Sequence, residues 1–241
     1  MHTSYSALDT FKTCPLKYKY QEIDKIRGPK RVEQVFGTLV HSALKFMFER
    51  GPLYPTLDQV LDHYASSWNE SKEKIEWQDD AAKETADKLY FEEGQKMIRA
   101  FYKKNSPWNF NAIELESRFI VRLKDDITGA EHTVGGSIDR LDKDPESDTY
   151  EIIDYKTGKK MPSQEQTEEN MQLAVYSIAV LDRWPQVKPE QLKTTLYFLK
   201  HNDAVSVAMT AEKIENVKRN IGQVAVGVFG QLSEDHKKSW Q

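Results

Sequence analysis

The feature that most constrains this sequence is a pair of extended segments, residues 133–141 and 150–156, joined by the linker DKDPESD. The linker is rich in turn-forming residues, and the flanking segments are rich in β-branched and apolar side chains. This combination predicts two antiparallel strands of a hairpin. Because side chains two apart in a strand share a face, the pairing also decides which polar side chains meet.

The remaining segments predict further strands and several helices. The segment AIELESRFIVRL has apolar residues at alternate positions, which predicts a strand with one apolar face. A second hairpin is expected across HNDA, between residues 193–199 and 205–209. The order of elements predicts an α/β fold, in which a mixed sheet is flanked by helices. The expected helices are a short one near the N-terminus with a break at Pro15, one over residues 37–50, two or three within 57–104, one over 165–181 and one over 212–231.

Composition limits the class of protein. The chain has 241 residues, enough for one buried core, with 39% hydrophobic and 30% charged residues. Its apolar runs are far shorter than the roughly 20 residues that cross a bilayer. The start, MHTSYSALDTFKTCP, lacks the pattern of a secretory signal, and the single cysteine, Cys14, cannot form an internal disulfide. We therefore expect a cytoplasmic protein without a membrane partner.

The net charge of −4 does not by itself indicate a nucleic-acid binder, but the charge is unevenly distributed. Between Phe11 and Val35 there are seven basic and three acidic residues, interleaved with Tyr18 and Tyr20. A solvated surface and a nucleic-acid contact are both compatible with this run. Charge therefore neither supports nor excludes nucleic-acid binding.

Three polar residues of the first hairpin are placed to act together. Asp154 and Lys156 share a face, and the pairing brings Asp139 near Asp154. Two carboxylates about 4 Å apart repel by roughly 4 kcal/mol at an effective dielectric of 20, and Lys156 offsets only part of this repulsion. A divalent cation removes it, and oxygen ligands favour Mg²⁺ or Mn²⁺ over zinc. A surface hairpin with exposed salt-bridging side chains is the alternative.

A cation at this position suits phosphodiester hydrolysis. It polarises a phosphoryl oxygen and lowers the pKa of a bound water. Lys156 would orient the nucleophile or stabilise charge in the transition state. The backbone carbonyl of Tyr155 is a candidate for a further ligand.

Several sequence pieces occur in a fixed order: SYSALDTFKTCPLKYKY, FGTLVH, GGSIDRLD followed by EIIDYKTG, and MQLAVY. In this order they resemble the helical start, the G-x-x-x-H motif, the two catalytic strand motifs and the Q-x-x-x-Y motif of the RecB family. This family belongs to the PD-(D/E)XK nuclease superfamily. The resemblance spans residues 4 to about 180.

The resemblance implies a restriction-endonuclease-like fold with a central mixed sheet. It implies one nuclease domain over residues 1–241, with a helical lobe over about 1–105 and a catalytic sheet core over about 106–241. It also implies an Mg²⁺- or Mn²⁺-dependent deoxyribonuclease, an exonuclease that often acts on single strands. DNA is then the substrate, in repair, recombination or CRISPR adaptation, with a helicase or a CRISPR adaptation protein as a further partner.

The resemblance assigns roles to eight residues. For four of them an ordinary role is also open. His41 fits a buried core position, and Glu116 fits a solvated strand position. Gln172 and Tyr176 are one helical turn apart and also fit a polar helix surface. The implied metal ligands are His41, Asp139, Asp154 and the carbonyl of Tyr155; the catalytic residues are Asp139, Asp154 and Lys156; the supporting or DNA-contacting residues are Gln172, Tyr176 and Glu116.

Neighbouring residues are expected to contribute indirectly. Gly37 would let the start of its helix pack close to the sheet. Gly135-Gly136 predicts a bulge or a close approach of the backbone to DNA. Arg140 and Asp142 are expected at most to support the ligands.

Cys14 is a departure from part of the family. Many relatives combine a cysteine at this position with three near the C-terminus to hold a [4Fe–4S] cluster. This chain has no other cysteine, so it cannot supply the four thiolates.

Two rival functions remain open at this stage. One is a catalytically silent DNA-binding or scaffold domain of a helicase–nuclease complex. Such a domain would be expected to have lost an acid or the lysine. This sequence keeps all four positions, which are His41, Asp139, Asp154 and Lys156. The other is a sequence-specific restriction enzyme, which is less favoured because no separate base-reading domain is visible.

Overall fold

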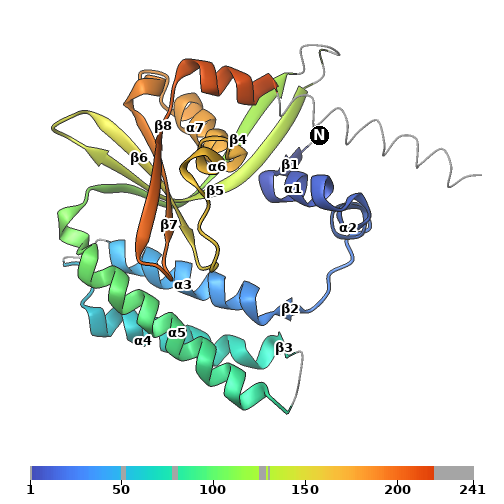
Figure 1. The fold of residues 1–241 in the computed structure, drawn as a ribbon, viewed down its shortest axis with the longest axis vertical. Coiled ribbons are helices and arrows are strands. Elements are labelled where there is room, and N and C mark those ends of the chain that lie inside the picture. Colours follow the sequence, from blue (N-terminus) through green and yellow to red (C-terminus); the bar gives the residue numbers. More distant parts are fainter. Residues whose placement is uncertain (1, 50–52, 78–80, 125–128, 130, 220–241) are drawn as a thin grey trace, which may run out of the picture.

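The computed structural model describes residues 2–49, 53–77, 81–124, 129 and 131–219. Six strands of this part form one mixed sheet, with helices on both of its faces (Figure 1). This is the α/β arrangement that the sequence predicts. In chain order the strands are β1 (His2–Ser4), β4 (Ala112–Lys124), β5 (Glu131–Asp144), β6 (Thr149–Lys156), β7 (Leu192–Phe198) and β8 (Asp203–Ala208).

The sheet has the order β1-β5-β6-β7-β8. β4 is not on this path and pairs with β5. β5 pairs antiparallel with β4 and β6, β6 pairs parallel with β7, and β7 pairs antiparallel with β8. Both predicted hairpins, β5–β6 and β7–β8, are therefore confirmed. The sequence does not predict β1, which pairs parallel with β5, because three residues are too few to show a strand period.

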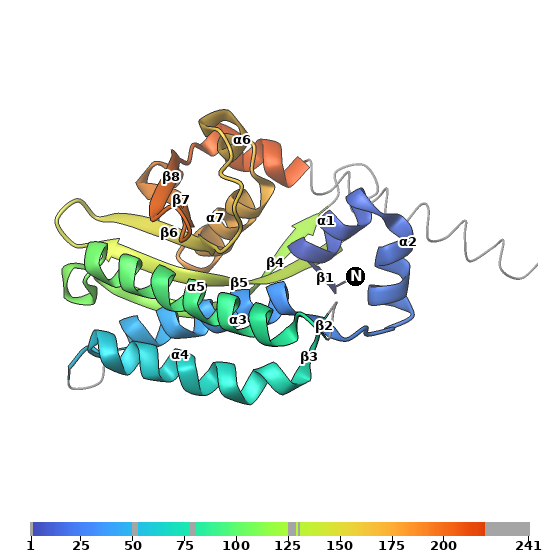
Figure 2. The ribbon, with the colours of Figure 1, turned by 60° about the horizontal axis from the view of Figure 1, so that its bottom comes forward.

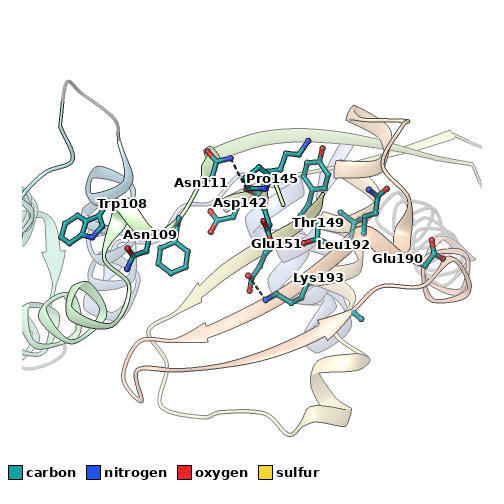
Figure 3. Close-up of a pocket in the computed structure, with 16 residues that line it drawn as sticks. Trp108, Asn109, Asn111, Asp142, Pro145, Thr149, Glu151, Glu190, Leu192 and Lys193 are labelled. Atoms are coloured by element: carbon teal, nitrogen blue, oxygen red, sulfur yellow. Dashed lines mark hydrogen bonds and ion pairs between the residues drawn. The ribbon is translucent and has the colours of Figure 1, made fainter. Parts of the chain in front are cut away.

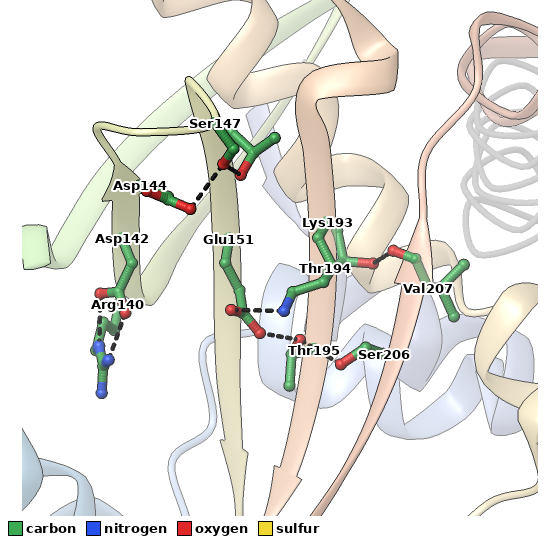
Figure 4. Close-up of polar contacts among 11 residues, drawn as sticks. Arg140, Asp142, Asp144, Ser147, Glu151, Lys193, Thr194, Thr195, Ser206 and Val207 are labelled. Carbon is green, nitrogen blue, oxygen red and sulfur yellow. Dashed lines mark hydrogen bonds and ion pairs between the residues drawn. The ribbon is translucent and has the colours of Figure 1, made fainter. Parts of the chain in front are cut away.

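The turn of the β5–β6 hairpin is fixed by its own side chains (Figure 4). Asp144 accepts hydrogen bonds from the backbone N–H of Glu146 at 2.9 Å and from the hydroxyl of Ser147 at 2.7 Å. Asp148 has a φ of 50°, a left-handed conformation that aspartate tolerates better than most residues. The turn sets a register in which pairing starts at Asp144 and Thr149 and ends at Arg140 and Ile153.

Two groups of helices cover the sheet (Figure 2). On one face α3, α4 and α5 form a buried cluster with Ile153, Tyr155 and Tyr197, and on the other face α7 and α1 form a second cluster with Ile152 and Leu141. None of the described helices has both the length and the apolar character needed to cross a membrane. The helices are α1 (Tyr5–Thr13), α2 (Pro15–Tyr18), α3 (Val32–Phe48), α4 (Leu57–Ser71), α5 (Lys83–Lys104), α6 (Gln164–Glu168) and α7 (Met171–Arg183).

The beginning of the chain packs with the sheet. Ala7, Leu8 and Tyr18 belong to the same buried cluster as α7, and not to the cluster of α3, α4 and α5. The division of the domain near residue 105 stays a prediction. The short remaining elements are a π-helical turn (Lys19–Ile23), 3-10 turns (Lys72–Lys74, Pro107–Asn109, Pro189–Gln191), the parallel pair β2 (Lys30–Arg31) with β3 (Ile75–Glu76), and a helical stretch over residues 211–219.

Two helix predictions were wrong in their limits. The helix expected over residues 37–50 begins at Val32, because Val32, Val35 and Phe36 extend its buried face, so Gly37 lies inside the helix. The helix expected over residues 165–181 is two helices, because Asn170 stops the first and caps the second. The expected helix over residues 212–231 is described only as far as residue 219.

The prediction that β4 has a single apolar face was also wrong. Leu115 packs against the cluster of α3, α4 and α5, whereas Phe119 and Val121 belong to the cluster on the opposite face. Between them, Glu116 has a φ of 46°. A residue in this left-handed conformation breaks the regular alternation of a strand, so β4 changes the face to which its apolar residues point.

The bulge expected at Gly135-Gly136 is absent from the described pairing. Gly135 pairs with Ile120 and Gly136 with Phe119 in regular register, and the register shift lies between Ala112 and Glu114. A Cβ atom at Gly136 would lie 2.6 Å from Cζ of Phe119. The glycine therefore provides room for the phenylalanine ring across the strand pair.

Arg140 ties the helical side of the molecule to the sheet. Its guanidinium packs against two rings, 3.7 Å from the centroid of Phe48 at the end of α3 and 4.6 Å from that of Phe110. It forms a bidentate ion pair with Asp142, in which Nε donates at 2.6 Å and Nη2 also donates. Its Nη1 donates to the hydroxyl of Tyr155 at 3.3 Å. All of these groups lie on the face covered by α3, so Arg140 and Asp142 organise that face.

Replacing Arg140 by Met should lower the free energy of unfolding by about 3 to 5 kcal/mol, because Asp142 would keep a buried charge without its partner. The double variant Arg140→Met/Asp142→Leu should recover much of this loss, since both charges are then removed. Urea unfolding of both variants measures the difference. Equal losses in the two variants would contradict a stabilising ion pair and assign the effect to packing alone.

A pocket of about 670 Å³ opens at the start of β6 and β7 (Figure 3). Trp108, Glu151 and Lys193 are among the residues that line it. Lys193 forms an ion pair with Glu151 at 2.8 Å. None of the eight residues with a predicted role lines this pocket, so its size does not mark the predicted centre.

Candidate metal and active centre

His41 projects from the middle of α3 toward the sheet. Its Nδ1 lies 3.4 Å from Oδ2 of Asp139, and its ring meets the ring of Tyr155 edge-on at a centroid distance of 5.9 Å. Gly37 lies one turn earlier, where an added Cβ would be 3.4 Å from the hydroxyl oxygen of Thr157. An added Cβ would therefore be in contact with Thr157 without a severe clash, and a need for glycine in the approach of α3 to the sheet stays a prediction.

Asp139 lies just beyond the last paired residues of β5 and β6. Its Oδ2 accepts a hydrogen bond from the backbone N–H of Tyr155 at 2.7 Å. The carboxylate thus takes the place that a strand partner would occupy, and only 9% of the residue is exposed. Tyr155 meets the centre through its N–H, and a ligand role for its carbonyl stays a prediction.

Glu116 points to the same place from β4. The ligand atoms of His41, Glu116 and Asp139 all lie within 4.8 Å of one another. The Glu116 carboxylate accepts a hydrogen bond from the hydroxyl of Ser137 at 3.3 Å. Its left-handed backbone carries a strain of roughly 1 to 3 kcal/mol, which proteins retain where the geometry serves a site.

Asp154, Lys156, Gln172 and Tyr176 form a closed ring of contacts beside this cluster. Lys156 Nζ lies 2.6 Å from Oδ2 of Asp154 and donates to Oε1 of Gln172 at 2.9 Å. Gln172 Nε2 donates to the hydroxyl of Tyr176 at 2.7 Å, and this hydroxyl donates to Oδ1 of Asp154 at 3.2 Å. Each side chain is held by two others, so the ring fixes the position of the lysine amine.

The break between α6 and α7 places Gln172 in this ring. Asn170 caps α7, and its side-chain oxygen accepts hydrogen bonds from the backbone N–H groups of Gln172 at 2.9 Å and Leu173 at 3.2 Å. Gln172 therefore lies in the first turn of α7, and Tyr176 follows one turn later on the same side. An asparagine two residues before Gln172 is a recognisable capping signal, and sequence analysis missed it.

The pKa values of Asp154, Glu116 and His41 are all raised, but not by the same causes. Burial raises the pKa of Asp154, and although Lys156 opposes this effect, the charge of Asp139 adds to it. Burial and then the charge of Asp139 raise the pKa of Glu116. Burial alone would lower the pKa of His41, but the hydrogen bond and charge of Asp139 outweigh it and raise the pKa.

These properties fit a divalent cation. Imidazole and carboxylate groups are donors that such ions accept, and the cluster brings three of them together. Oδ2 of Asp154 is fully buried, and the ammonium of Lys156 lies 2.6 Å from it. Burial and the charge of Asp139 still oppose the ionised form of Asp154, and a cation would offset both effects. His41, Glu116, Asp139 and Asp154 are the residues available to hold the ion.

The comparison with known families now bears on this centre. A family model of the PD-(D/E)XK nuclease superfamily matches residues 2–239. The chain belongs to the PD-(D/E)XK nuclease superfamily. Its activity class is therefore metal-dependent phosphodiester hydrolysis by a nuclease, and the observed mixed sheet with flanking helices is consistent with the restriction-endonuclease-like fold.

Comparisons with individual sequences and solved structures do not refine the assignment of the chain to the PD-(D/E)XK nuclease superfamily. No curated protein sequence matches it. The crystal structure of SSO0001 is similar, with 13% sequence identity over 83% of this chain and 85% of that chain and a TM-score of 0.38. A likeness at this level carries no argument about function.

Replacing Glu116 by Gln should weaken Mn²⁺ binding about tenfold or more, because the substitution removes a charge from the cluster. Isothermal titration calorimetry of wild type and variant measures the change. The matched control is Glu190→Gln, since Glu190 is an exposed acid at the other end of the sheet. Unchanged affinity in Glu116→Gln would exclude Glu116 as a ligand.

Mn²⁺ affinity of the wild type should rise as the pH increases through and beyond the usual titration range of an imidazole, because ligands bind a metal only when deprotonated. The raised pKa values of His41, Glu116 and Asp154 hold protons on these groups to higher pH than usual. Binding should therefore release protons, and more of them at the acid end. Titrations in buffers of different ionisation enthalpy measure this release, and a pH-independent affinity would contradict it.

Proposed function

We propose that this PD-(D/E)XK protein is an Mg²⁺- or Mn²⁺-dependent deoxyribonuclease of the RecB type that degrades DNA from an end. The observation that carries the proposal is the closed ring of Asp154, Lys156, Gln172 and Tyr176 next to the cluster of His41, Glu116 and Asp139. Each sequence motif that resembles the RecB family, the helical start aside, contributes a residue to one of these two groups. The ring and the cluster together offer a lysine amine beside a candidate cation position.

A divalent cation held by His41, Glu116, Asp139 and Asp154 would stabilise charge on a phosphoryl oxygen and lower the pKa of the attacking water. Hydrolysis forms a P–O bond from that water and breaks the bond to the leaving oxygen. Lys156 supports this step because an ammonium has three N–H donors, and its described contacts with Asp154 and Gln172 engage two. One donor is left to orient the water or to contact a phosphate oxygen.

The roles of Gln172 and Tyr176 are positional in this proposal. Tyr176 is 5% exposed, and its hydroxyl is engaged on both sides, by Gln172 as donor and Asp154 as acceptor. Such a buried phenol favours holding the Asp154 carboxylate over contacting DNA. Gln172 likewise has its amide oxygen on Lys156 and its amide nitrogen on Tyr176, which fixes the direction of the amine.

Retention of the acids and the lysine supports an active enzyme over a silent scaffold domain. The work of the protein in repair, recombination or CRISPR adaptation, with a helicase or adaptation protein as partner, belongs to the same proposal. It rests on the resemblance to the RecB family. The choice of DNA, and of an end as the point of attack, rests on it as well.

Asp154→Asn and Lys156→Met should each lower the cleavage rate at least about 100-fold, the usual loss when one electrostatic contact in a transition state is removed. End-labelled single- and double-stranded oligonucleotides with Mg²⁺ or Mn²⁺ provide the assay, and chelator should abolish activity. Lys103→Met, at an exposed position near the end of α5, is the matched control. Wild-type rates in Asp154→Asn would overturn the proposal, and internal cuts without shortening from an end would overturn the exonuclease assignment.

A further inference from the structure

One segment of the chain is exposed along its whole length. From Lys19 to Arg31 every residue is exposed, although the segment connects two packed parts of the molecule. Its anchor is Tyr18, which is completely buried and meets Phe11 of α1 edge-on at 5.4 Å. At the other end the chain enters α3 at Val32. In Figure 1 the segment arches from α2 to the start of α3.

The helical part of this segment presents an apolar stripe to the outside. Leu16 lies in α2, and Tyr20 and Ile23 lie in the π-helical turn that follows; their side chains are 57%, 45% and 42% exposed. Ile26 continues the stripe and is 59% exposed. Four large apolar side chains close together in one exposed segment indicate a binding surface.

The charges around the stripe are strongly positive. Over residues 16–31 there are six basic residues and two acidic ones, a net charge of +4 in a chain whose total is −4. The two acids are engaged locally, Glu22 with Lys25 at 3.5 Å and Asp24 with Lys19 at 3.1 Å. The other four cations have no acidic partner within the described part of the chain; they are Lys17, Arg27, Lys30 and Arg31.

We propose that the segment Leu16–Arg31 is a binding surface for single-stranded DNA, an inference that rests on the nuclease function proposed above. Free cations provide contacts for phosphates, and exposed apolar and aromatic side chains provide contacts for the faces of bases. Base faces are accessible in a single strand but are stacked inside a duplex. The combination therefore selects an unpaired strand.

The surface is close enough to serve the centre. It ends at Arg31, next to Val32, and His41 lies nine residues further along the same helix, about 14 Å at 1.5 Å per residue. The other end of the surface is held near the centre by α1, because Lys12 of α1 contacts Met171, the residue before Gln172, at 3.0 Å. A strand bound on the segment thus lies beside the cluster and the ring.

The test separates binding from chemistry. Fluorescence anisotropy with EDTA present measures binding of a labelled deoxythymidine oligonucleotide of about 20 nucleotides, longer than the roughly 4–16 nucleotides that strand-binding modules cover. Tyr20→Ala should weaken binding about fivefold or more through loss of stacking. Lys30→Glu/Arg31→Glu should weaken it further and reduce the slope of log affinity against log salt by about 0.7 for each phosphate that is no longer neutralised. A duplex of the same length should bind more weakly and respond little to Tyr20→Ala.

Matched controls carry the same changes elsewhere. Leu89→Ala removes a comparably exposed apolar side chain from α5, and Lys96→Glu/Arg99→Glu reverses two exposed cations of that helix. Both should bind like the wild type. All the substituted residues are exposed, so thermal unfolding should be unchanged.

Hydrolysis of bis(p-nitrophenyl) phosphate distinguishes a failure of the proposed nuclease function from a failure of the surface inference. This small diester has no bases and only one phosphate. Tyr20→Ala should hydrolyse it at the wild-type rate. If hydrolysis does not depend on Asp154, the proposed nuclease function fails even where Tyr20→Ala weakens DNA binding. If hydrolysis depends on Asp154 but both surface variants bind the single strand normally, the surface inference fails alone.

Two further results would overturn the inference. A duplex bound as tightly as the single strand, with the same loss in Tyr20→Ala, would contradict recognition of base faces. Sedimentation showing that the wild type dimerises and Tyr20→Ala does not would assign the apolar stripe to a second copy of the chain.

Discussion

Repulsion between buried carboxylates is the constraint around which the centre of this protein is organised. Asp139, Asp154 and Glu116 come together from three neighbouring strands, and the nearby positive groups are His41 and Lys156. Burial makes each charge more costly, and the raised pKa values express that cost. An arrangement of this kind is suited to bind a cation, which offsets the repulsion and releases protons from groups whose pKa is raised.

The strands are shaped to bring these acids together. Regular pairing between β5 and β6 ends one residue before Asp139 and Asp154, and β4 changes face at Glu116. Both of these departures from regular sheet structure occur at the same level. A regular sheet would leave its side chains alternating between two separate cores. These two irregularities thus lie at the place where the chemistry is proposed.

Sequence patterns predicted the elements better than their details. The β5–β6 hairpin was predictable because the extended apolar segments and the turn residues between them agree, and this pairing brings Asp139 near Asp154. The face change of β4 was not predictable, because a single polar residue at an apolar position, Ser117, does not signal a left-handed φ at Glu116. The limits of α3 were missed because Gly37 suggested a start, whereas the buried residues before it extend the helix. The contact between His41 and Asp139 joins residues almost 100 positions apart, and motif resemblance, not local pattern, pointed to it.

The position of His41 on α3 has a thermodynamic consequence. The other candidate ligands belong to the sheet, so an ion bound among them would link α3 to the sheet in addition to the apolar packing that already joins them. An ion that binds only the folded, docked arrangement stabilises it in proportion to the logarithm of the ion concentration. The rigidity of the contact between α3 and the sheet would then vary with the concentration of divalent cations. Binding of the ion would restrict the geometry around Lys156.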